Sequence, residues 1–571
     1  MKQLNNKYQA ILQVVLLLAI LIAVNVLAST VYQRIDLTKE GRFTLTEATQ
    51  NLLLDLDDVV YVRIYLEGEL NPGFRRLRNG TLDMLNEFRA YAGNDLEYEF
   101  IDPIGGTSVE ERKAIIDQLS EKGLQPTRVF EPDGSESILF PGLIVAYKGR
   151  ELAVPLLLEQ LNRPPQETLN NSIALIEYNI ANAIQKLRRP TKPAIAFLEG
   201  HGELPAPEVG DMTATLENYY VVNRFDITKE LYIPPRYNAV IIARPTKTFE
   251  EVNKFKIDQY IMNGGRVLWL LENMATSLDS MQRDGGKFIA LDYGLDIEDQ
   301  LFRYGVRINF DLIQDLQCTQ IPLTVGTDQF GNARQMRLFP WPYFPVINLA
   351  NNEHPVTKNL NAVLGQFVAT VDTIQTKAAI EKTILLTTSS RTRVMPAPIM
   401  VDVNDVRQNR QVDDARFNAG PQPIAVALEG VFPSPFKNRL APETIAMIDT
   451  IEGVDFREES KPTRMVVISD GDMIRNDYDP INNRISPLGY YKFTKENFAN
   501  KALIQNAVEW LTDENGIIAA RSKDIKLRLL DAPKVKAEKT TWQLVNLGIP
   551  LLALLVFGIG YNYVRKRKYA S

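Results

Sequence analysis

Two long stretches without a charged residue, one near each end, limit most strongly what this 571-residue chain can fold into. The first runs from Ile11 to Ala28 and consists mostly of Leu, Ile, Val and Ala. As a helix, its 18 residues rise roughly 27 Å, enough to cross the hydrocarbon core of a bilayer. The second, Thr540–Val564, is longer. Together they predict a membrane protein whose two ends are anchored and whose middle is a large folded body.

Details of both stretches support transmembrane helices over residues 9–30 and 540–564. Trp542, Tyr561 and Tyr563 lie at the two ends of the second stretch, where aromatic side chains favour the membrane interfaces. The alternative for the first stretch is a cleaved signal peptide. Its apolar run is longer than the usual core of such a peptide, which favours an uncleaved anchor.

The distribution of basic residues predicts the orientation. Arg565–Lys568 is a run of four basic residues directly after the second stretch, and such clusters remain in the cytoplasm. Two crossings then place residues 1–8 in the cytoplasm as well. Everything between about residues 30 and 539 is therefore expected on the far side of a bacterial inner membrane, in the periplasm.

Composition excludes several classes of protein. The formal net charge of −6 does not suggest nucleic-acid binding. Cys318 is the only cysteine, so no intramolecular disulfide can form, and ordinary hydrophobic cores must stabilise the body. With one Cys and two His in the whole chain, a structural zinc site is not expected. We predict neither a metal nor a cofactor.

Residues 50–165 are expected to form a thioredoxin-like domain. Apolar patterning predicts a strand over 59–68, a helix over 75–92, a strand over 96–103 and a hairpin turning near Lys148-Gly149. This order matches the thioredoxin layout. The Cys-x-x-Cys motif is absent, which excludes thioredoxin redox chemistry and leaves only the scaffold.

A connecting helix over 166–190, most regular between Leu169 and Leu187, precedes an α/β domain predicted over 191–520. Short apolar strands alternate there with amphipathic helices, which favours a doubly wound parallel sheet of the glutamine-amidotransferase-like or flavodoxin-like kind. The expected strands share an apolar core and lie at 193–200, 237–245, 266–273, 422–432 and 463–474; the expected helices lie at 212–220, 250–265 and 500–514. The polar stretch 402–420 is expected to be a mobile loop, and 521–539 a linker.

Several stretches together resemble a known family. They are "RIDLTKEGRFTLTEAT" after the first anchor, "FLEGHGE", "AVALEGVFPSPF", "VVISDGDMI", "NAVEWLTDENGIIAARSKDI" and the basic C-terminal helix. In this order and spacing they are similar to the gliding-motility-associated ABC transporter auxiliary proteins of the Bacteroidetes, the substrate-binding-like GldG family. That family belongs to the auxiliary components of ABC-2-type transport systems, and one of its domains is likened to intraflagellar-transport proteins.

The resemblance covers essentially the whole chain and implies partners. They are an ABC permease subunit, a separate cytoplasmic ATPase subunit, and other envelope or secretion components that support gliding. We therefore expect a non-catalytic, membrane-anchored auxiliary subunit. The alternatives are a periplasmic scaffold, or an envelope enzyme that processes glycan or peptide with the His201 region.

The segment "FLEGHGE" is the main candidate site. His201 and Glu203 follow a predicted parallel strand, and ligands of open α/β sheets bind beyond the carboxyl ends of strands. Asp470 and Asp472 follow another such strand. The four side chains could contact a ligand or cation or exchange protons. The simpler interpretation is a tight glycine turn in which the histidine bonds to backbone, and it is the favoured one.

Other catalytic patterns are missing from the sequence. There is no G-x-x-x-x-G-K-[ST], and "GGKF" at Gly285 lacks both the spacing and the hydroxyl residue. There is no G-x-S-x-G. Cys318 is expected to be a buried, inert thiol, and "FPWPYFP" (339–345) a packed loop, with a docking surface as the alternative. Gly264-Gly265 is expected to end a helix before a strand.

Overall fold

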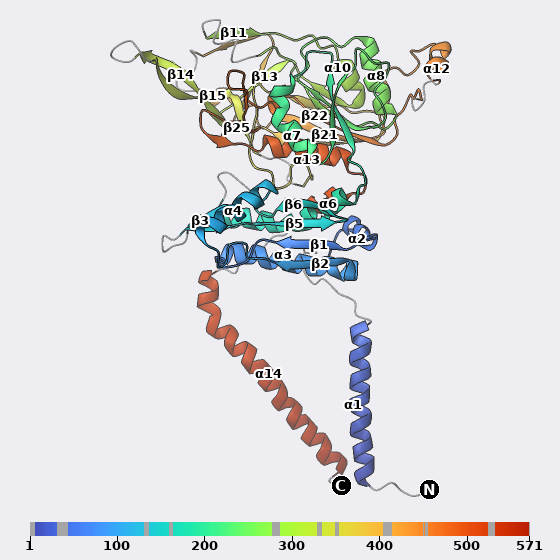
Figure 1. Ribbon diagram of the computed structural model, residues 1–571, viewed down its shortest axis with the longest axis vertical. Helices are drawn as coiled ribbons and strands as arrows, with labels where there is room; N and C mark the ends of the chain where they lie inside the picture. The colour runs from blue at the N-terminus through green and yellow to red at the C-terminus, as the bar shows by residue number, and fades with distance from the viewer. Residues whose placement is uncertain are drawn as a thin grey trace. The chain divides into compact units, whose positions relative to one another are not determined.

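The structure is a computed structural model that describes residues 6–30, 44–130, 136–158, 164–276, 286–327, 334–348, 353–403, 414–448, 450, 455–522 and 532–569 (Figure 1). Met1–Asp524 and Ile525–Ser571 are two separate units. The first unit contains helices and several sheets, and the described part of the second unit is a single helix, as the sequence predicts.

The terminal stretches are helical. α1 spans Asn6–Thr30 and α14 spans Ala532–Tyr569, with Pro550 inside α14. Within the described residues, one helix is both long and apolar enough to cross a bilayer: Lys534–Arg567, with a mean hydropathy of 2.1. The apolar part of the first helix, Val14–Asn25, is shorter. The C-terminal helix is thus a candidate membrane span, and a second span at the N-terminus stays a prediction.

The N-terminal sheet has four strands in the order β2-β1-β5-β6. β1 runs parallel to β2 and antiparallel to β5, and β5 runs antiparallel to β6. β3 and β4 pair in a separate two-stranded sheet. The elements of this region, in chain order, are α2 (Glu47–Leu54), β1 (Val60–Ile64), α3 (Pro72–Ala92), η1 (Gly93–Asp95), β2 (Leu96–Phe100), α4 (Val109–Glu121), β3 (Thr127–Phe130), β4 (Glu136–Leu139), β5 (Gly142–Tyr147) and β6 (Arg150–Pro155). The two strands, the helix between them and the hairpin lie where the sequence predicts.

Local chemistry explains the ends of these elements. Asn71 caps α3, because its side chain accepts hydrogen bonds from the backbone N–H groups of Gly73 and Phe74 at 3.1 Å. Lys148 and Gly149 turn the β5–β6 hairpin with positive φ angles of 49° and 75°. That is the conformation that two-residue hairpins require.

The connecting segment is two helices rather than the single helix expected from 169 to 187. α5 spans Pro165–Ala174 and α6 spans Ile176–Arg188. Near the break, the Ser172 hydroxyl donates to the carbonyl of Thr168 at 2.8 Å and accepts the N–H of Leu158 at 2.9 Å. A serine hydroxyl bonded to the carbonyl four residues earlier bends a helix, and the tie to Leu158 holds the bend in place.

A seven-stranded sheet forms the core of the remaining chain, in the order β18-β21-β22-β10-β9-β7-β8. Five strands are parallel: β22 (Thr463–Ile468), β10 (Val267–Leu270), β9 (Tyr237–Ala243), β7 (Ala194–Glu199) and β8 (Val221–Asp226). The sequence predicts a parallel sheet, but β21 (Pro423–Gly430) is antiparallel to β22, and β18 (Ile380–Thr387) is antiparallel to β21. The sheet is therefore mixed at one edge.

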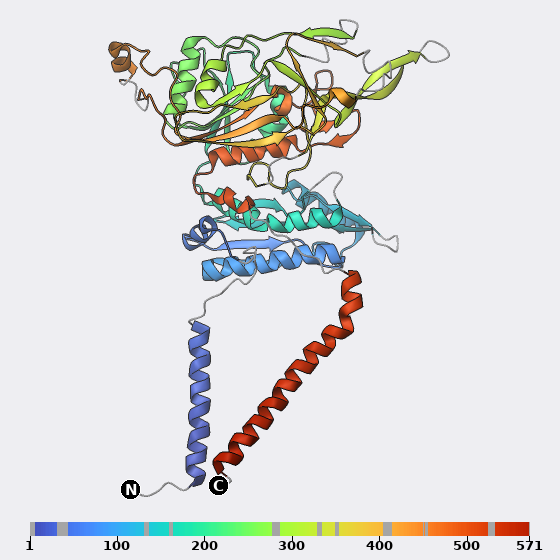
Figure 2. The same cartoon turned by 180° about the vertical axis from the view of Figure 1, so that it is seen from behind.

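Helices cover both faces of this sheet (Figures 1 and 2). α8 (Glu251–Met262) and α10 (Glu298–Tyr304) pack on one face, in a core that includes the fully buried Trp269. α13 (Asn500–Thr512) crosses the other face over β9, β10 and β22, and α7 (Gly210–Glu217) contacts it. Tyr260 of α8 donates to the carbonyl of Tyr237 at 2.9 Å and joins that helix to the start of β9.

Apart from α10 and β18, residues 286–403 build short sheets beside the main one. The elements there are β11 (Lys287–Ala290), β12 (Val306–Ile308), β13 (Asp311–Asp315), β14 (Cys318–Thr327), β15 (Arg334–Ile347), β16 (Val363–Leu364), β17 (Val371–Thr373), β19 (Thr392–Pro396) and β20 (Ile399–Asp402). The segment 339–345 is part of strand β15, not a loop, and Trp341 and Phe344 are fully buried. Most of the expected mobile loop at 402–420 lies outside the described residues.

Short elements complete the chain. They are η2 (Ala206–Val209), η3 (Asp414–Arg416), α12 (Pro442–Ile448), η4 (Gly471–Ile474), β23 (Tyr478–Asp479), β24 (Arg484–Ile485), β25 (Tyr490–Tyr491), β26 (Glu496–Asn497) and η5 (Ile517–Ser522). The segment 478–497 lies close to the carboxyl ends of the parallel strands, where it borders a cavity described below.

Candidate functional site

The carboxyl ends of the parallel strands bring charged side chains to one edge of the sheet. His201 follows β7, Arg244 follows β9, Glu272 follows β10, and Asp470 follows β22. In the strand order β8-β7-β9-β10-β22, the chain leaves β7 and β9 in opposite directions. The crevice between these two strands is where open α/β sheets bind ligands.

The chain itself fills this crevice. The carbonyl of His201 accepts the N–H groups of Thr246 and Lys247 at 2.8 and 2.9 Å, and the N–H of Leu204 bonds to the carbonyl of Ala243 at 3.0 Å. These bonds join the loop after β7 to the loop after β9. A ligand in the usual position would therefore have to displace backbone hydrogen bonds.

The His201 side chain is built into this turn. It is 2% exposed and stacks on Phe249 with the ring centroids 3.9 Å apart. Its Nε2 lies 3.2 Å from the amide nitrogen of Asn253, and its Nδ1 lies 3.5 Å from Oε1 of Glu203. Glu203 also accepts the N–H of His201 at 2.8 Å. The His201 ring thus contacts side chains, whereas the turn favoured from the sequence has the histidine bonded to backbone; ligand contact by His201 and Glu203 stays a prediction.

Both flanking glycines are required by the turn. Gly200 and Gly202 have φ angles of 126° and 74°, which side chains other than glycine rarely adopt. A Cβ at Gly200 would approach Thr228 Cγ2 to 2.7 Å, and one at Gly202 would overlap Thr246 Oγ1. The glycines therefore allow the close approach of the loops after β7, β8 and β9.

Asp470 and Asp472 lie elsewhere on the same edge. β9 and β10 separate β22 from β7, so three strand spacings, about 14 Å, divide the two predicted pairs. In the described part of the chain, no hydrogen bond or ion pair joins His201 or Glu203 to either aspartate. The structure thus holds two sites at this edge, not one cluster of four.

A cluster around Arg244 occupies the ends of β9, β10 and β22. Arg244 Nε lies 2.6 Å from Glu272 Oε2 and 3.2 Å from Asp472 Oδ1. Glu272 also accepts a hydrogen bond from Thr276, and Asp470 accepts the N–H groups of Gln366 and Asp472 at 2.8 Å. Arg244 has a φ of 54°, a conformation that costs free energy and is concentrated at functional sites.

Burial perturbs the acids of this cluster. Burial, reinforced by the nearby Asp472 carboxylate, raises the pKa of Glu272 to about 7 against the attraction of Arg244. Burial and the same neighbour raise the pKa of Asp470 well above its usual range. Perturbed acids in a cleft are candidates for function, although buried structural networks show the same shifts.

A cavity of about 210 Å³ opens beside this cluster. Arg244, Asp472 and Lys492 contribute charged groups to its wall, and Phe344, Phe367 and Tyr491 contribute aromatic rings. Gly471 allows the wall to form, because a Cβ there would lie 2.5 Å from Cγ of Arg244. Among the described residues, no group of three or more His, Cys, Asp or Glu is arranged to hold a metal ion.

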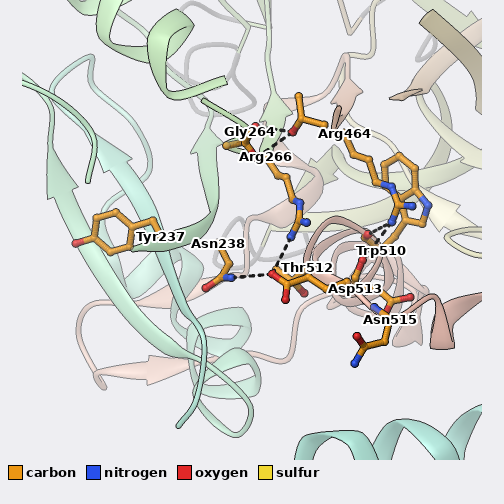
Figure 3. A network of polar contacts seen from close by, with 12 residues as sticks. Tyr237, Asn238, Gly264, Arg266, Arg464, Trp510, Thr512, Asp513 and Asn515 are labelled. Atoms are coloured by element: carbon orange, nitrogen blue, oxygen red, sulfur yellow. Dashed lines mark hydrogen bonds and ion pairs between the residues drawn. The ribbon is translucent and has the colours of Figure 1, made fainter. Parts of the chain in front are cut away.

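The opposite, amino-terminal edge of the sheet carries a second polar network (Figure 3). Arg266 and the Asn238 amide approach Glu514 Oε1 at 3.7 and 3.5 Å. Arg464 donates to the carbonyls of Trp510 and Asp513 at the end of α13, and its guanidinium lies 5.1 Å from the Trp510 ring. These contacts cap a helix carboxyl end with a cation, which is a structural role.

Cys318 begins β14 and is half-buried. Burial, with a smaller effect of the Asp315 charge, raises the pKa of its thiol to about 12. Thiolate is the reactive form of cysteine, so this shift lowers the reactivity of the thiol near neutral pH; the sequence predicts full burial, and the side chain is half-buried.

Comparison with known proteins identifies the family. Residues 192–507, which include the seven-stranded sheet and both sites at its edge, match the family described as "ABC-type uncharacterized transport system". The match spans more than half of the chain. The chain belongs to this family of ABC transporter auxiliary proteins.

Other comparisons extend the match across the chain. Residues 39–146 match a domain of unknown function. An uncharacterized protein of Borreliella burgdorferi is 21% identical over 579 residues, which cover 99% of this chain and 100% of that protein. Among solved structures, the mmIFT52 N-terminal domain is similar at 13% identity and a TM-score of 0.31, covering 56% of this chain and 97% of that domain. That score is too low to support an argument about the fold.

Proposed function

We propose that this member of the ABC transporter auxiliary family is a non-catalytic subunit, anchored in the inner membrane, that acts with a permease and a separate ATPase. The observation that carries the proposal is the match of residues 192–507 to that family in a chain that also holds a helix long enough to cross a bilayer. An auxiliary role also agrees with the sequence, because the chain has no nucleotide-binding P-loop and must draw its energy from a partner.

The proposed topology has two membrane anchors and a periplasmic body. The 25-residue helix α1 and the 38-residue helix α14 support it by their lengths. The basic run Arg565–Lys568 supports cytoplasmic termini. On this proposal the body lies on the opposite side of the membrane from cytoplasmic ATP.

We propose the same domain boundaries that the sequence suggests. The strand order β2-β1-β5-β6, with α3 joining two parallel strands and an antiparallel pair completing the sheet, supports a thioredoxin-like domain over 50–165. The order β8-β7-β9-β10-β22, with helices on both faces, supports a flavodoxin-like or amidotransferase-like domain over 191–520. Residues 166–190 connect the two, and 521–539 lead to the last helix.

The finer assignment to gliding motility rests on sequence resemblance. The motifs at 197–203, 425–436 and 466–474, together with the basic C-terminal helix, resemble the GldG family of the Bacteroidetes. We therefore propose a role in gliding and its associated secretion. The substrate-binding label of that family would apply here to the cavity beside Arg244, which Asp472 lines and near which Asp470 lies; ligand contact by His201 and Glu203 would belong to the separate turn after β7.

The test is affinity isolation of the full-length protein after mild detergent extraction, followed by mass spectrometry. A multi-spanning permease and its ATPase should be recovered with the tagged chain. The matched control is a chain in which residues 532–569 are replaced by an unrelated transmembrane helix, which should recover less permease. Recovery of intact protein without any permease would contradict the proposal and favour a scaffold.

A further inference from the structure

The strand-end cavity, which is the cavity of about 210 Å³ beside Arg244, has an unused hydrogen-bond acceptor in its wall. Arg244 Nε and Arg475 Nη1 both approach the same oxygen of Asp472, Oδ1, at 3.2 and 3.4 Å. Among the described residues, no donor bonds the other oxygen, Oδ2, although the Asp472 side chain is 7% exposed. Buried carboxylate oxygens normally have a donor, so this oxygen is available to a ligand that donates hydrogen bonds.

The two arginines of the same wall have unused donors. Arg244 donates through Nε to Glu272 at 2.6 Å and through Nη2 to the carbonyl of Thr276 at 3.2 Å. Arg475 Nε lies 2.7 Å from Glu208 Oε2. Within the described ranges of the chain, neither Nη1 of Arg244 nor Nη2 of Arg475 has an acceptor. A guanidinium carries five N–H donors in a fork that matches a carboxylate, so these groups are available to an anionic ligand group.

The charges of this wall are paired. Both arginines have two carboxylate neighbours, and Asp472 is shared between them. A further pair in the wall joins Lys492 Nζ to Asp477 Oδ2 at 3.1 Å. A ligand with a single charge would add an unbalanced charge to this wall, and an unpaired charge in a buried site is costly. A zwitterion adds one charge of each sign and so preserves the balance.

Aromatic rings supply an apolar part of the wall. Phe344 and Phe367 are at most 2% exposed, and their rings meet edge to face with the centroids 5.2 Å apart. Tyr491 is 8% exposed, and its hydroxyl donates to the carbonyl of Gln320 at 2.8 Å, which holds its ring in place. A cavity of about 150 Å³ holds a benzene ring, so the strand-end cavity, at about 210 Å³, has room for an apolar side chain.

We propose that the strand-end cavity binds a free amino acid with an aromatic or other apolar side chain. Its ammonium group donates to Oδ2 of Asp472. Its carboxylate accepts from the unused N–H groups of Arg244 and Arg475. Its side chain packs against Phe344 and Phe367. The inference rests on the proposed function only in taking this cavity as the substrate site.

The test is saturation-transfer NMR of the full-length protein in detergent, with L-phenylalanine as the probe and protein-free micelles as the blank. L-Phenylalaninamide lacks the carboxylate and N-acetyl-L-phenylalanine lacks the ammonium group. We expect both analogues to bind about tenfold more weakly than L-phenylalanine, because each loses charged hydrogen bonds. Equal or tighter binding of either analogue would overturn the zwitterion and indicate one end of a peptide instead. Absence of any signal from L-phenylalanine at millimolar concentration would also overturn the proposal.

Two variants assign the binding to this cavity. Arg475→Gln should weaken L-phenylalanine about tenfold and leave L-phenylalaninamide unchanged, because only the contact with the carboxylate is lost. Arg457→Gln is the matched control: both arginine side chains are 37% exposed, and Arg457 lies 3.3 Å from Asp455, outside the cavity. It should leave binding of L-phenylalanine unchanged. Equal affinities of the two variants would overturn the proposal, and their melting temperatures show that both are folded.

The outcomes separate this inference from the proposed function. Permease recovered by affinity isolation, together with no binding of L-phenylalanine, contradicts only the class of ligand. Binding of L-phenylalanine that depends on Arg475, without any recovered permease, supports the class of ligand and contradicts the transport partnership.

Discussion

Lys186 and Glu509 form an ion pair of 2.7 Å across 323 residues of sequence, with side chains 14% and 7% exposed. The carboxylate has further donors in Tyr178 and Gln505, so it is satisfied as well as neutralised. A buried pair is weak evidence for stability in itself, but removal of one partner leaves an uncompensated charge. The pair therefore makes the junction between α6 and α13 sensitive to single substitutions.

Lys186→Met should lower the apparent free energy of unfolding by about 3–5 kcal/mol, because the Glu509 carboxylate would remain buried without its cation. Denaturant titration followed by tryptophan fluorescence would measure this, since Trp510 lies next to Glu509 on α13. The control is Lys437→Met, whose partners Glu458 and Glu459 have exposed side chains, and it should leave the free energy of unfolding almost unchanged. Equal effects of the two variants would contradict the importance of the buried pair.

Acid should weaken the same junction. Burial tends to raise the pKa of Glu509. The Lys186 charge and its hydrogen bond oppose burial and outweigh it, so the pKa falls to about 2. Because this pKa is lower in the folded than in the unfolded state, the ionised Glu509 stabilises the fold at pH values above the unfolded pKa of 4.5. That contribution is lost as the pH falls toward 2. The acid side of the stability curve should therefore be flatter in Glu509→Gln than in the native chain. Parallel curves would show that Glu509 does not contribute.

The Glu272 carboxyl predicts the opposite dependence on pH. Its folded-state pKa of about 7 lies above the unfolded value of 4.5, so its stabilising contribution is present below about pH 4.5 and is lost as pH rises through 7. Glu272→Gln should raise the melting temperature at pH 8, and the gain should disappear near pH 5. Melting curves at the two pH values test this. A variant that is less stable than the native chain at pH 8 would show that the charge of Glu272 is needed beside Arg244.

Substitution of Gly202 tests the turn that holds His201. Gly202→Ala should destabilise the protein by about 1–2 kcal/mol for the positive φ, with about 1–3 kcal/mol more for the overlap with Thr246. Gly294→Ala is the matched control, because Gly294 has a φ of 65° and nothing within 4 Å of an added Cβ. Thermal unfolding should therefore rank the Gly202 variant below the Gly294 variant. The reverse order would mean that the loops after β7 and β9 are not held together as described.

Truncation separates one anchor from two. A chain that ends at residue 531 lacks α14, and we expect α1 to keep it in the membrane pellet after an alkaline carbonate wash. Complete release into the supernatant would contradict a spanning α1 and leave the C-terminal helix as the anchor.

The parallel strands could be predicted from sequence because each is a short apolar run that ends in turn residues. β7, β9, β10 and β22 all lie where those runs predict. β15 was harder to predict, because Pro340, Pro342 and Pro345 argue against an interior strand. The structure accommodates them where the β14–β15 register shifts, between Cys318 and Gln320, and a long strand results.

The candidate site could be located from sequence only in part. His201 and Asp470 were visible because glycine and polar residues follow a predicted strand. Arg244 and Glu272 form no motif with them, although each is the first charged residue after an equally apolar strand, "AVIIAR" and "VLWLLE". Their pairing depends on strand order, which a single sequence does not contain.

The side of the membrane on which Ile481 lies tests the account most directly. Ile481 is 91% exposed, and the raised pKa of Cys318 keeps the native thiol a slow-reacting background. We predict that Ile481→Cys reacts with a membrane-impermeant maleimide in spheroplasts whose inner membrane is intact, as a periplasmic body requires. Labelling that appears only after the inner membrane is broken would place the body beside cytoplasmic ATP and contradict the account.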